Sequence, residues 1–325
     1  MLPIALDAMG GDNAPGAIIE GAHRAVAELG VPIVLVGRPD EIESLRGDLD
    51  VLPASEVIAM DDAGSKVRTM KDSSLVRAAE AVRDGKASAM VSAGNTGATM
   101  ASALLRMGRI KGVARPAIAT PIPVPGSTPT VLLDAGANAE CQPQWLVQFA
   151  QMGAVFARER YGIAEPRVGL LSIGEEASKG NPLVKETHAL LAEPGALDRA
   201  GARFVGNVEG RDIMTDDVDV VVTDGFTGNV ALKTLEGGMR ALVRSVLGAL
   251  GATPVADEAV AALMPLYADL DPDSTGGAML LGVDGVCIIS HGSSSATAVV
   301  NALRVAGEMV EAGVVERLRS VVSPA

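Results

Sequence analysis

The sequence predicts an α/β protein built on a mostly parallel sheet with helices on both faces. Short apolar runs that end in Gly-rich turns alternate with Ala-rich helical stretches along the whole chain, and only 2% of the residues are aromatic. Alternation of this kind is typical of a parallel sheet that is covered on both sides. The chain has 325 residues, 48% of them hydrophobic, and can bury a large core. We expect one α/β domain over residues 1–325.

The expected elements follow each other in a regular order. Strands are expected at the apolar runs Ile4–Asp7, Ile33–Gly37, Ala89–Ser92, Val131–Asp134, Val168–Ser172, Val218–Thr223 and Val286–Ser290. Helical periodicity predicts helices around 16–29, 73–84, 97–107, 144–160, 182–192, 230–250 and 294–312. Residues 252–276 interrupt this order as a helical excursion. Pro265 is expected to kink that helix or to break it into a hairpin.

Charge and composition exclude several classes of protein. The formal net charge of −13 repels a polyphosphate backbone, so we expect no nucleic-acid partner. Asp7 comes before any apolar signal region could form, and no apolar run approaches the ~20 residues that span a bilayer. Cys141 and Cys287 cannot make a disulfide framework. We therefore expect a cytoplasmic protein.

Four Gly-rich turns are candidates for an anion site. Residues 91–98 (VSAGNTGA) and 222–229 (VTDGFTGN) share the pattern [ST]-x-G-x-T-G between a strand and a helix. Residues 7–12 (DAMGGD) and 134–138 (DAGAN) also follow strands. Such turns expose N–H groups and the positive end of a helix dipole, and ligands gather at the carboxyl ends of parallel strands. A shared anionic ligand is one interpretation, and ordinary turn chemistry is the other.

The motifs of several enzyme classes are absent. The sequence has no G-x-G-x-x-G fingerprint, no P-loop and no G-x-S-x-G elbow, and its three histidines lack metal-ligand spacing. We expect neither a metal nor another cofactor.

A phosphate nucleophile needs none of these groups when it attacks a thioester. Its site must position it, balance its charge and donate hydrogen bonds to the developing oxyanion.

Three polar residues are candidates for that chemistry. Lys179 lies in SIGEEASKGN (172–181) after an apolar strand, Asn229 ends the second T-G turn, and His291 precedes a helix. The alternatives are a solvated lysine, a helix N-cap and a histidine that ties down its own turn. The aspartates that end strands are expected to accept hydrogen bonds from turn amides; they are Asp7, Asp134 and Asp224.

Taken in order, these motifs closely resemble the PlsX-type phosphate acyltransferases. The resemblance spans nearly the whole chain and is most specific at 219–237. It is carried by DAMGGD (7–12), VSAGNTGA (91–98), GRIKGVARPA (108–117), LLDAGAN (132–138), RVGLLSIGEEASKGN (167–181), FVGNVEGRD (204–212), DVVVTDGFTGNVALKTLEG (219–237) and HGSS (291–294). It implies a three-layer αβα sandwich similar to isopropylmalate dehydrogenases and phosphotransacetylases, and a homodimer.

The resemblance also implies an activity. A fatty acyl group would pass reversibly from acyl carrier protein to inorganic phosphate, and a membrane glycerol-3-phosphate acyltransferase would use the acyl phosphate for phospholipid synthesis. Lys179 and Asn229 are implicated in catalysis, by direct attack of phosphate on the thioester. The substrate-binding residues that we expect are Gly10, Gly11, Gly94, Asn95, Thr96, Gly97, Asn138, Gly225, Thr227, Gly228 and His291.

Three alternatives to this activity stay open. The first is a phosphate acetyl- or butyryltransferase that uses acyl-CoA, because the chemistry would be the same with another carrier. The second is a nicotinamide-dependent dehydrogenase on a similar fold. The third is a membrane scaffold without enzymatic activity, which would leave the Gly-rich turns unexplained.

Two surface segments are candidates for contacts with partners. A cationic run without Asp or Glu is either a solvated loop or a dock for an acidic carrier; it consists of Arg106, Arg109, Lys111 and Arg115. The excursion has apolar residues at the spacing of one helical face; they are Val255, Ala259, Leu263, Leu266 and Leu270. Relatives with a similar layout are peripheral membrane proteins, so this face either contacts lipid weakly or packs in a dimer.

Overall fold

The computed structural model describes residues 1–251, 256–270 and 274–322. Its strands are β1 (Ile4–Asp7), β2 (Ile33–Gly37), β3 (Asp50–Pro53), β4 (Ala89–Ser92), β5 (Ala117–Ile122), β6 (Thr130–Leu133), β7 (Arg167–Leu171), β8 (Arg203–Val208), β9 (Val220–Val222), β10 (Ala278–Leu281) and β11 (Val286–Ile289). They form one eleven-stranded sheet in the order β3-β2-β1-β4-β11-β10-β5-β6-β9-β7-β8.

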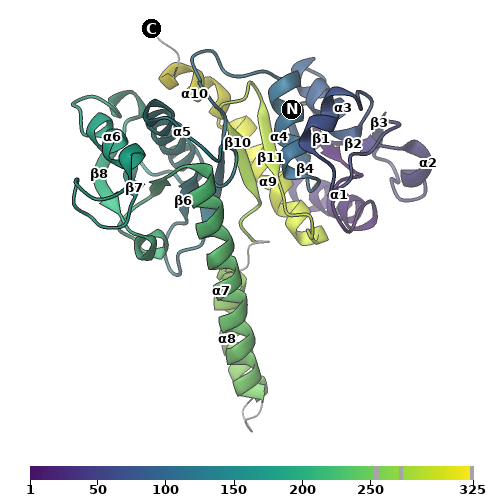
Figure 1. Ribbon diagram of the computed structural model, residues 1–325. Coiled ribbons are helices and arrows are strands. Elements are labelled where there is room, and N and C mark those ends of the chain that lie inside the picture. The colour runs from purple at the N-terminus through teal and green to yellow at the C-terminus, as the bar shows by residue number, and fades with distance from the viewer. Residues whose placement is uncertain (252–255, 271–273, 323–325) are drawn as a thin grey trace.

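Helices cover both faces of this sheet (Figure 1). The α-helices are α1 (Gly16–Leu29), α2 (Pro39–Ile42), α3 (Ser74–Arg83), α4 (Thr96–Arg106), α5 (Pro143–Tyr161), α6 (Pro182–Leu191), α7 (Gly225–Gly251), α8 (Ala256–Leu270), α9 (Ala296–Glu311) and α10 (Val314–Val322). Short 3-10 helices lie at η1 (Gly64–Arg68), η2 (Asp198–Ala200) and η3 (Gly210–Met214).

The three layers follow from the alternation of side chains along the strands. In β1, Ile4 and Leu6 join the core under α1, α5, α9 and α10, whereas Ala5 joins the core under α3 and α4. Because both faces are covered, the central strands are largely apolar and buried, whereas the edge strands β3 and β8 contain exposed polar residues. The predicted α/β sandwich with a mostly parallel sheet is therefore confirmed.

The direction of the strands reverses in the middle of the sheet. β10 is antiparallel to both β11 and β5, and β6 is antiparallel to β5. The group β6-β9-β7-β8 therefore runs opposite to the group β3-β2-β1-β4-β11, and each group is parallel within itself. The two halves meet at β10 and β5, which run through the centre of the molecule.

All seven predicted strands and all seven predicted helices are present, but the patterns missed four strands and two helices. The missed strands are β3, β5, β8 and β10, and the missed helices are α2 and α10. β5 has the sequence AIATPI, in which Pro121 interrupts the strand pattern. In β8, a register shift falls opposite Val168 and Gly169 of its partner strand, so its side chains do not alternate regularly.

The helical excursion starts earlier than the sequence predicted. α7 is a single helix of 27 residues, and its second half projects from the body of the molecule beside α8 (Figure 1). Pro265 lies inside α8, which continues through it, so the hairpin turn does not form at Pro265. Val255 lies outside the described residues. Of the described helices, none is long and apolar enough to cross a membrane.

Candidate active site

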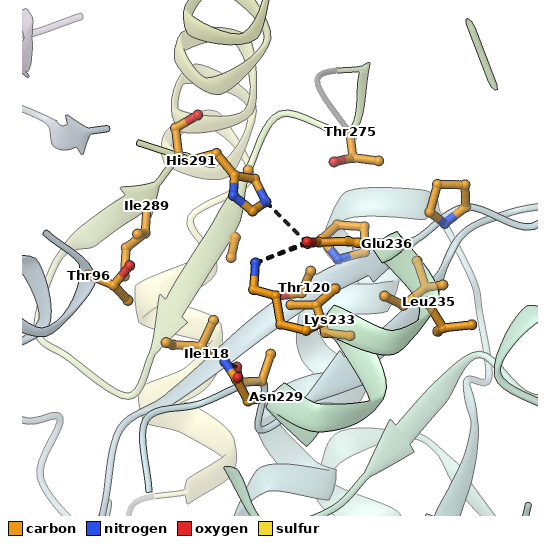
Figure 2. A pocket seen from close by; sticks show the side chains of 18 of the residues that line it. Thr96, Ile118, Thr120, Asn229, Lys233, Leu235, Glu236, Thr275, Ile289 and His291 are labelled. Carbon is orange, nitrogen blue, oxygen red and sulfur yellow. Dashed lines mark hydrogen bonds and ion pairs between the residues drawn. The ribbon is translucent and has the colours of Figure 1, made fainter. Parts of the chain in front are cut away.

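A pocket of about 170 Å³ lies where the two halves of the sheet meet (Figure 2). Its floor is β5, which contributes Ile118, Thr120 and Ile122 from one face, and α7 forms its wall. The turn before α4 and the turn after β11 close the opposite side, through Thr96 and His291. Segments from both halves of the chain therefore build one cavity.

The polar end of the pocket is organised around a buried carboxylate. Glu236 of α7 is only 8% exposed, and its carboxylate lies 3.0 Å from the ammonium of Lys233 and 3.3 Å from Nε2 of His291 (Figure 2). The guanidinium of Arg240 also lies near this carboxylate, at 3.8 Å. Burial alone would raise the pKa of Glu236, but the hydrogen bonds from His291 and Lys233 outweigh it and lower the pKa to about 2. The group is therefore ionised at neutral pH.

Asn229 lies one helical turn before Lys233 and on the same side of α7. Its side-chain amide donates a hydrogen bond to the carbonyl of Ala135, at 3.2 Å, and both residues line the pocket. Asn229 is not the helix N-cap, because α7 begins at Gly225. Asp224 occupies the cap position and accepts hydrogen bonds from the backbone and hydroxyl of Thr227, each at 2.8 Å.

His291 follows β11, the last strand along the chain, and lines the pocket. Its ring faces Glu236, while its backbone carbonyl accepts a hydrogen bond from the hydroxyl of Ser294 at 2.5 Å. The turn is therefore held by Ser294, and the imidazole is directed to the cavity. Thr96, the first residue of α4, lines the same cavity.

Lys179 lies outside the lining of this pocket. It is exposed in the loop between β7 and α6, and its backbone N–H donates to the carbonyl of Glu176 at 2.9 Å. Among the described residues, its ammonium has no hydrogen-bond or ion-pair partner. β7, the strand before the Lys179 loop, pairs with β9, the strand that leads into α7. The Lys179 loop and the start of α7 therefore follow neighbouring strands. The catalytic role of Lys179 stays a prediction.

The four Gly-rich turns associate in two pairs. In the first pair, a Cβ on Gly10 would lie 2.8 Å from the backbone nitrogen of Gly94, and Ser92 donates to the carboxylate of Asp7 at 2.7 Å. In the second pair, Gly225 donates to the carbonyl of Asn138 at 2.8 Å, and a Cβ on Gly228 would clash with the carbonyl of Asp134. These glycines allow close contact between backbones.

The strand-ending aspartates accept hydrogen bonds from their turns, as the sequence predicted. Asp134 is fully buried and accepts from the amides of Ile118, Gly136, Ala137 and Asn138 at 2.8–3.2 Å. Burial raises the pKa of Asp134, and these hydrogen bonds oppose the rise. Asp134 therefore organises the turn beside Asn229.

Several expected substrate-binding side chains are already bound within the protein. Asn95 caps α4 by accepting from the Ala98 amide at 2.9 Å, and its own amide donates to the carbonyls of Met60 and Asp62 at 2.8 Å. Asn138 donates to the carbonyl of Pro116 at 2.8 Å. Of the expected residues, Thr96, Asn229 and His291 line the pocket. Substrate contacts of the other expected residues stay predictions; they are Gly10, Gly11, Gly94, Asn95, Gly97, Asn138, Gly225, Thr227 and Gly228.

Sequence reasoning missed Lys233 and Glu236. Both stand in the specific block 219–237, and their spacing of three places them on one helical face. A Lys–Glu pair at this spacing resembles an ordinary exposed helix pair. The helix was also expected to begin at residue 230 rather than at Gly225, which left Asn229 outside it. With the earlier start, Asn229, Lys233 and Glu236 form one continuous polar stripe.

Apolar side chains line the same pocket as the polar ones. They include Leu232, Leu235 and Met239 of α7, and Ile118 and Ile122 of β5. One cavity thus combines polar donors with apolar side chains that can contact an alkyl group. This arrangement suits a substrate with an anionic head and a hydrocarbon tail.

The fold and the pocket define an α/β protein with a cavity between the two halves of one mostly parallel sheet. A family model described as fatty acid synthesis protein matches residues 2–317. The phosphate acyltransferase of Elusimicrobium minutum is 49% identical and that of Heliobacterium modesticaldum 50% identical; the matches cover 97% and 95% of this chain, and 94% of each relative. The chain belongs to the PlsX-type phosphate acyltransferase family and is a transferase.

Solved structures with the same fold are more distant in sequence. EutD phosphotransacetylase from Staphylococcus aureus superposes with a TM-score of 0.62 at 16% identity, over 95% of this chain and 94% of the other. The 4-hydroxythreonine-4-phosphate dehydrogenase from Klebsiella pneumoniae gives 0.55 at 12% identity, over 95% and 100%. At these identities the likeness shows the fold alone, and this fold is shared by transferases and dehydrogenases.

Proposed function

We propose that the protein transfers a fatty acyl group from acyl carrier protein to inorganic phosphate and releases acyl phosphate for phospholipid synthesis. The observation that carries the proposal is the single cavity that is lined both by Asn229, Lys233 and His291 and by Leu235 and Met239. An acyl phosphate likewise combines an anionic head with an alkyl tail. The names of the relatives support acyl transfer to phosphate.

The site can promote direct attack by phosphate. Phosphate is already anionic, so it needs charge compensation and orientation rather than a strong general base. Lys233 and His291 supply cationic or polar donors inside the cavity, and Lys179 adds positive charge from its loop. Asn229 orients the phosphate or the thioester oxygen, where negative charge develops in the transition state.

The decisive experiment compares two acyl donors. Purified protein is incubated with phosphate and either long-chain acyl carrier protein or the matching acyl-CoA, and acyl phosphate is trapped with hydroxylamine. We expect product from the carrier thioester. Product from acyl-CoA alone would overturn the choice of donor and favour the acetyl- or butyryltransferase alternative, whose fold is the same.

The two cysteines provide a test of direct attack. Burial raises the pKa of Cys141 and of Cys287 to about 12, so both thiols are protonated at neutral pH and are poor nucleophiles. We expect the Cys141→Ala/Cys287→Ala variant to remain active, with a stability loss of about 1 kcal/mol from the core position. Mass spectrometry of the wild type with acyl donor and no phosphate should show no adduct. A stoichiometric acyl-enzyme would contradict this mechanism.

We propose that the protein is cytoplasmic and a homodimer, and that its acyl phosphate passes to a membrane glycerol-3-phosphate acyltransferase.

The pair of helices α7 and α8 supports weak membrane contact, because it exposes several large apolar side chains to water; they are Leu242, Val246, Leu247, Met264, Leu266 and Tyr267. Asp257 and Glu258 at the start of α8 are exposed and would repel anionic headgroups.

Liposome sedimentation tests this contact. We expect weak, reversible binding that added salt does not weaken, because the contact is apolar. Leu266→Glu, at a side chain that is 44% exposed, should reduce binding and leave turnover of water-soluble substrates intact. If Leu266→Glu instead changes the oligomeric state, the same face packs in the dimer. Binding that needs anionic lipid and is lost with salt would place the attachment elsewhere.

A further inference from the structure

A second cleft opens on the surface beside the central pocket. It is lined by Leu104, Arg109, Ala114, Arg115, Pro116 and Trp145. We infer that this cleft is the docking surface for the acyl carrier protein, an acidic partner that brings its thioester on a flexible prosthetic arm. The inference rests on the proposed function and adds the place where the carrier binds.

The cleft carries unneutralised positive charge on an acidic protein. Arg109 and Arg115 are both exposed, and neither has an ion-pair partner among the residues that the structure describes. Arg106 differs, since Glu80 lies 3.7 Å from it. With a net charge of −13, the chain as a whole would repel an acidic partner. A local cationic surface is therefore required for such a partner to bind.

Both guanidinium groups are held in place before any partner binds. Arg109 donates to the carbonyls of Val113, at 3.4 Å, and of Ala114. Arg115 lies over the ring of Trp145, with 4.9 Å from its Cζ to the ring centroid, which is a cation–π contact. Little side-chain entropy remains to be lost when an acidic group binds there.

The loop that carries these arginines is fixed to the body of the protein. The side-chain amide of Gln148, on α5, accepts from the backbone of Ala114 and donates to the carbonyl of Gly112, each at 2.8 Å. Ile110 donates to the carbonyl of Gly282 at 3.0 Å, on the far side of the loop. The cations therefore form a preorganised surface rather than a mobile basic loop.

Apolar side chains complete the surface. Leu104 and Trp145 lie in the cleft, and the neighbouring Leu105 is 47% exposed. An apolar centre with an arginine-containing rim is typical of protein–protein interfaces.

The cleft and the central pocket share one segment of chain. Arg115 and Pro116 line the cleft, and Ile118, at the start of β5, lines the pocket. Three residues of extended chain cover ~10 Å at ~3.3 Å per residue. Asn138 also links the two sites, since it donates to the carbonyl of Pro116 and follows the turn that contains Ala135. A carrier on the cleft could thus place the thioester of its arm in the pocket.

Charge reversal tests the inference. At low salt, Arg109→Glu/Arg115→Glu should raise the KM for acyl carrier protein about tenfold or more, and should leave kcat and the phosphate KM within about twofold. The control Lys86→Glu/Lys185→Glu makes the same change in net charge at two exposed lysines of other surfaces. Arg115→Gln is the milder variant, because it keeps the Arg109 hydrogen bonds of the loop, and thermal unfolding checks that each variant folds.

Two further measurements separate this inference from the proposed function. An acyl-pantetheine thioester, which has no carrier protein, should react equally well with wild type and variant. Binding of fluorescently labelled acyl carrier protein should weaken in the arginine variants alone. An unchanged carrier KM, or an equal loss with acyl-pantetheine, would overturn the docking surface. Carrier that binds the wild-type cleft without forming acyl phosphate would support the surface and overturn the function.

Discussion

Replacing Asn229 or Lys179 with alanine should lower kcat/KM roughly 30- to 1,000-fold, equivalent to about 2–4 kcal/mol of transition-state stabilisation. Asn229 lines the pocket beside Lys233, in the cavity where we propose that phosphate attacks the thioester. Lys179 is an exposed cation with no partner among the described residues, so its charge is available to a phosphate anion. The measurement is steady-state kinetics with both substrates varied.

Folding should be almost unchanged in both variants. Asn229→Ala loses one hydrogen bond, to the carbonyl of Ala135, which is worth about 1 kcal/mol. Lys179→Ala loses no described side-chain hydrogen bond or ion pair. Lys185→Ala, on the neighbouring α6, is the matched control for removal of an exposed lysine. Turnover close to wild type in either variant would remove that residue from the mechanism.

Much of the fold could be predicted from the sequence because the sheet is covered on both faces. Buried strands such as IALD in β1 and VCII in β11 are continuous apolar runs, which stand out between Ala-rich helices. β5 and β10 could not be predicted in this way. Pro121 interrupts β5, and the antiparallel pairing of β10 depends on neighbours far away in the chain. The reversal of strand direction was therefore missed as well.

The site shows the same division between local and long-range information. The capping and turn chemistry of Asp134 and Asp224 is local, so sequence patterns predicted it. The environment of Glu236 is not local, because it includes His291, which comes from the other half of the molecule. A Lys–Glu pair at a spacing of three resembles an ordinary exposed helix pair. Only the packing of α7 over β5 turns it into part of a cavity.

The Lys233–Glu236 pair should show a strong coupling in catalysis. Lys233→Met should lower kcat/KM for phosphate about 30-fold or more, because it removes a charge-assisted contact worth about 2 kcal/mol. The variant also leaves the Glu236 carboxylate with fewer cations, and a phosphate dianion would be repelled by it. In the wild type, the pKa of about 2 keeps Glu236 ionised near neutral pH, and Lys233 is one of the groups that lower this pKa.

The double variant separates the two causes. Lys233→Met/Glu236→Gln removes the repelling carboxylate, so we expect it to recover about tenfold of the activity that Lys233→Met loses, although it carries one more substitution. Lys233→Arg should retain more activity than Lys233→Met, and Lys185→Met is the control on another surface. The double-mutant cycle in kcat/KM, with thermal unfolding of each variant, is the measurement. If Lys233→Met is nearly as active as wild type, or the double variant is weaker than Lys233→Met, Glu236 does not act through Lys233 and the phosphate lies elsewhere in the pocket.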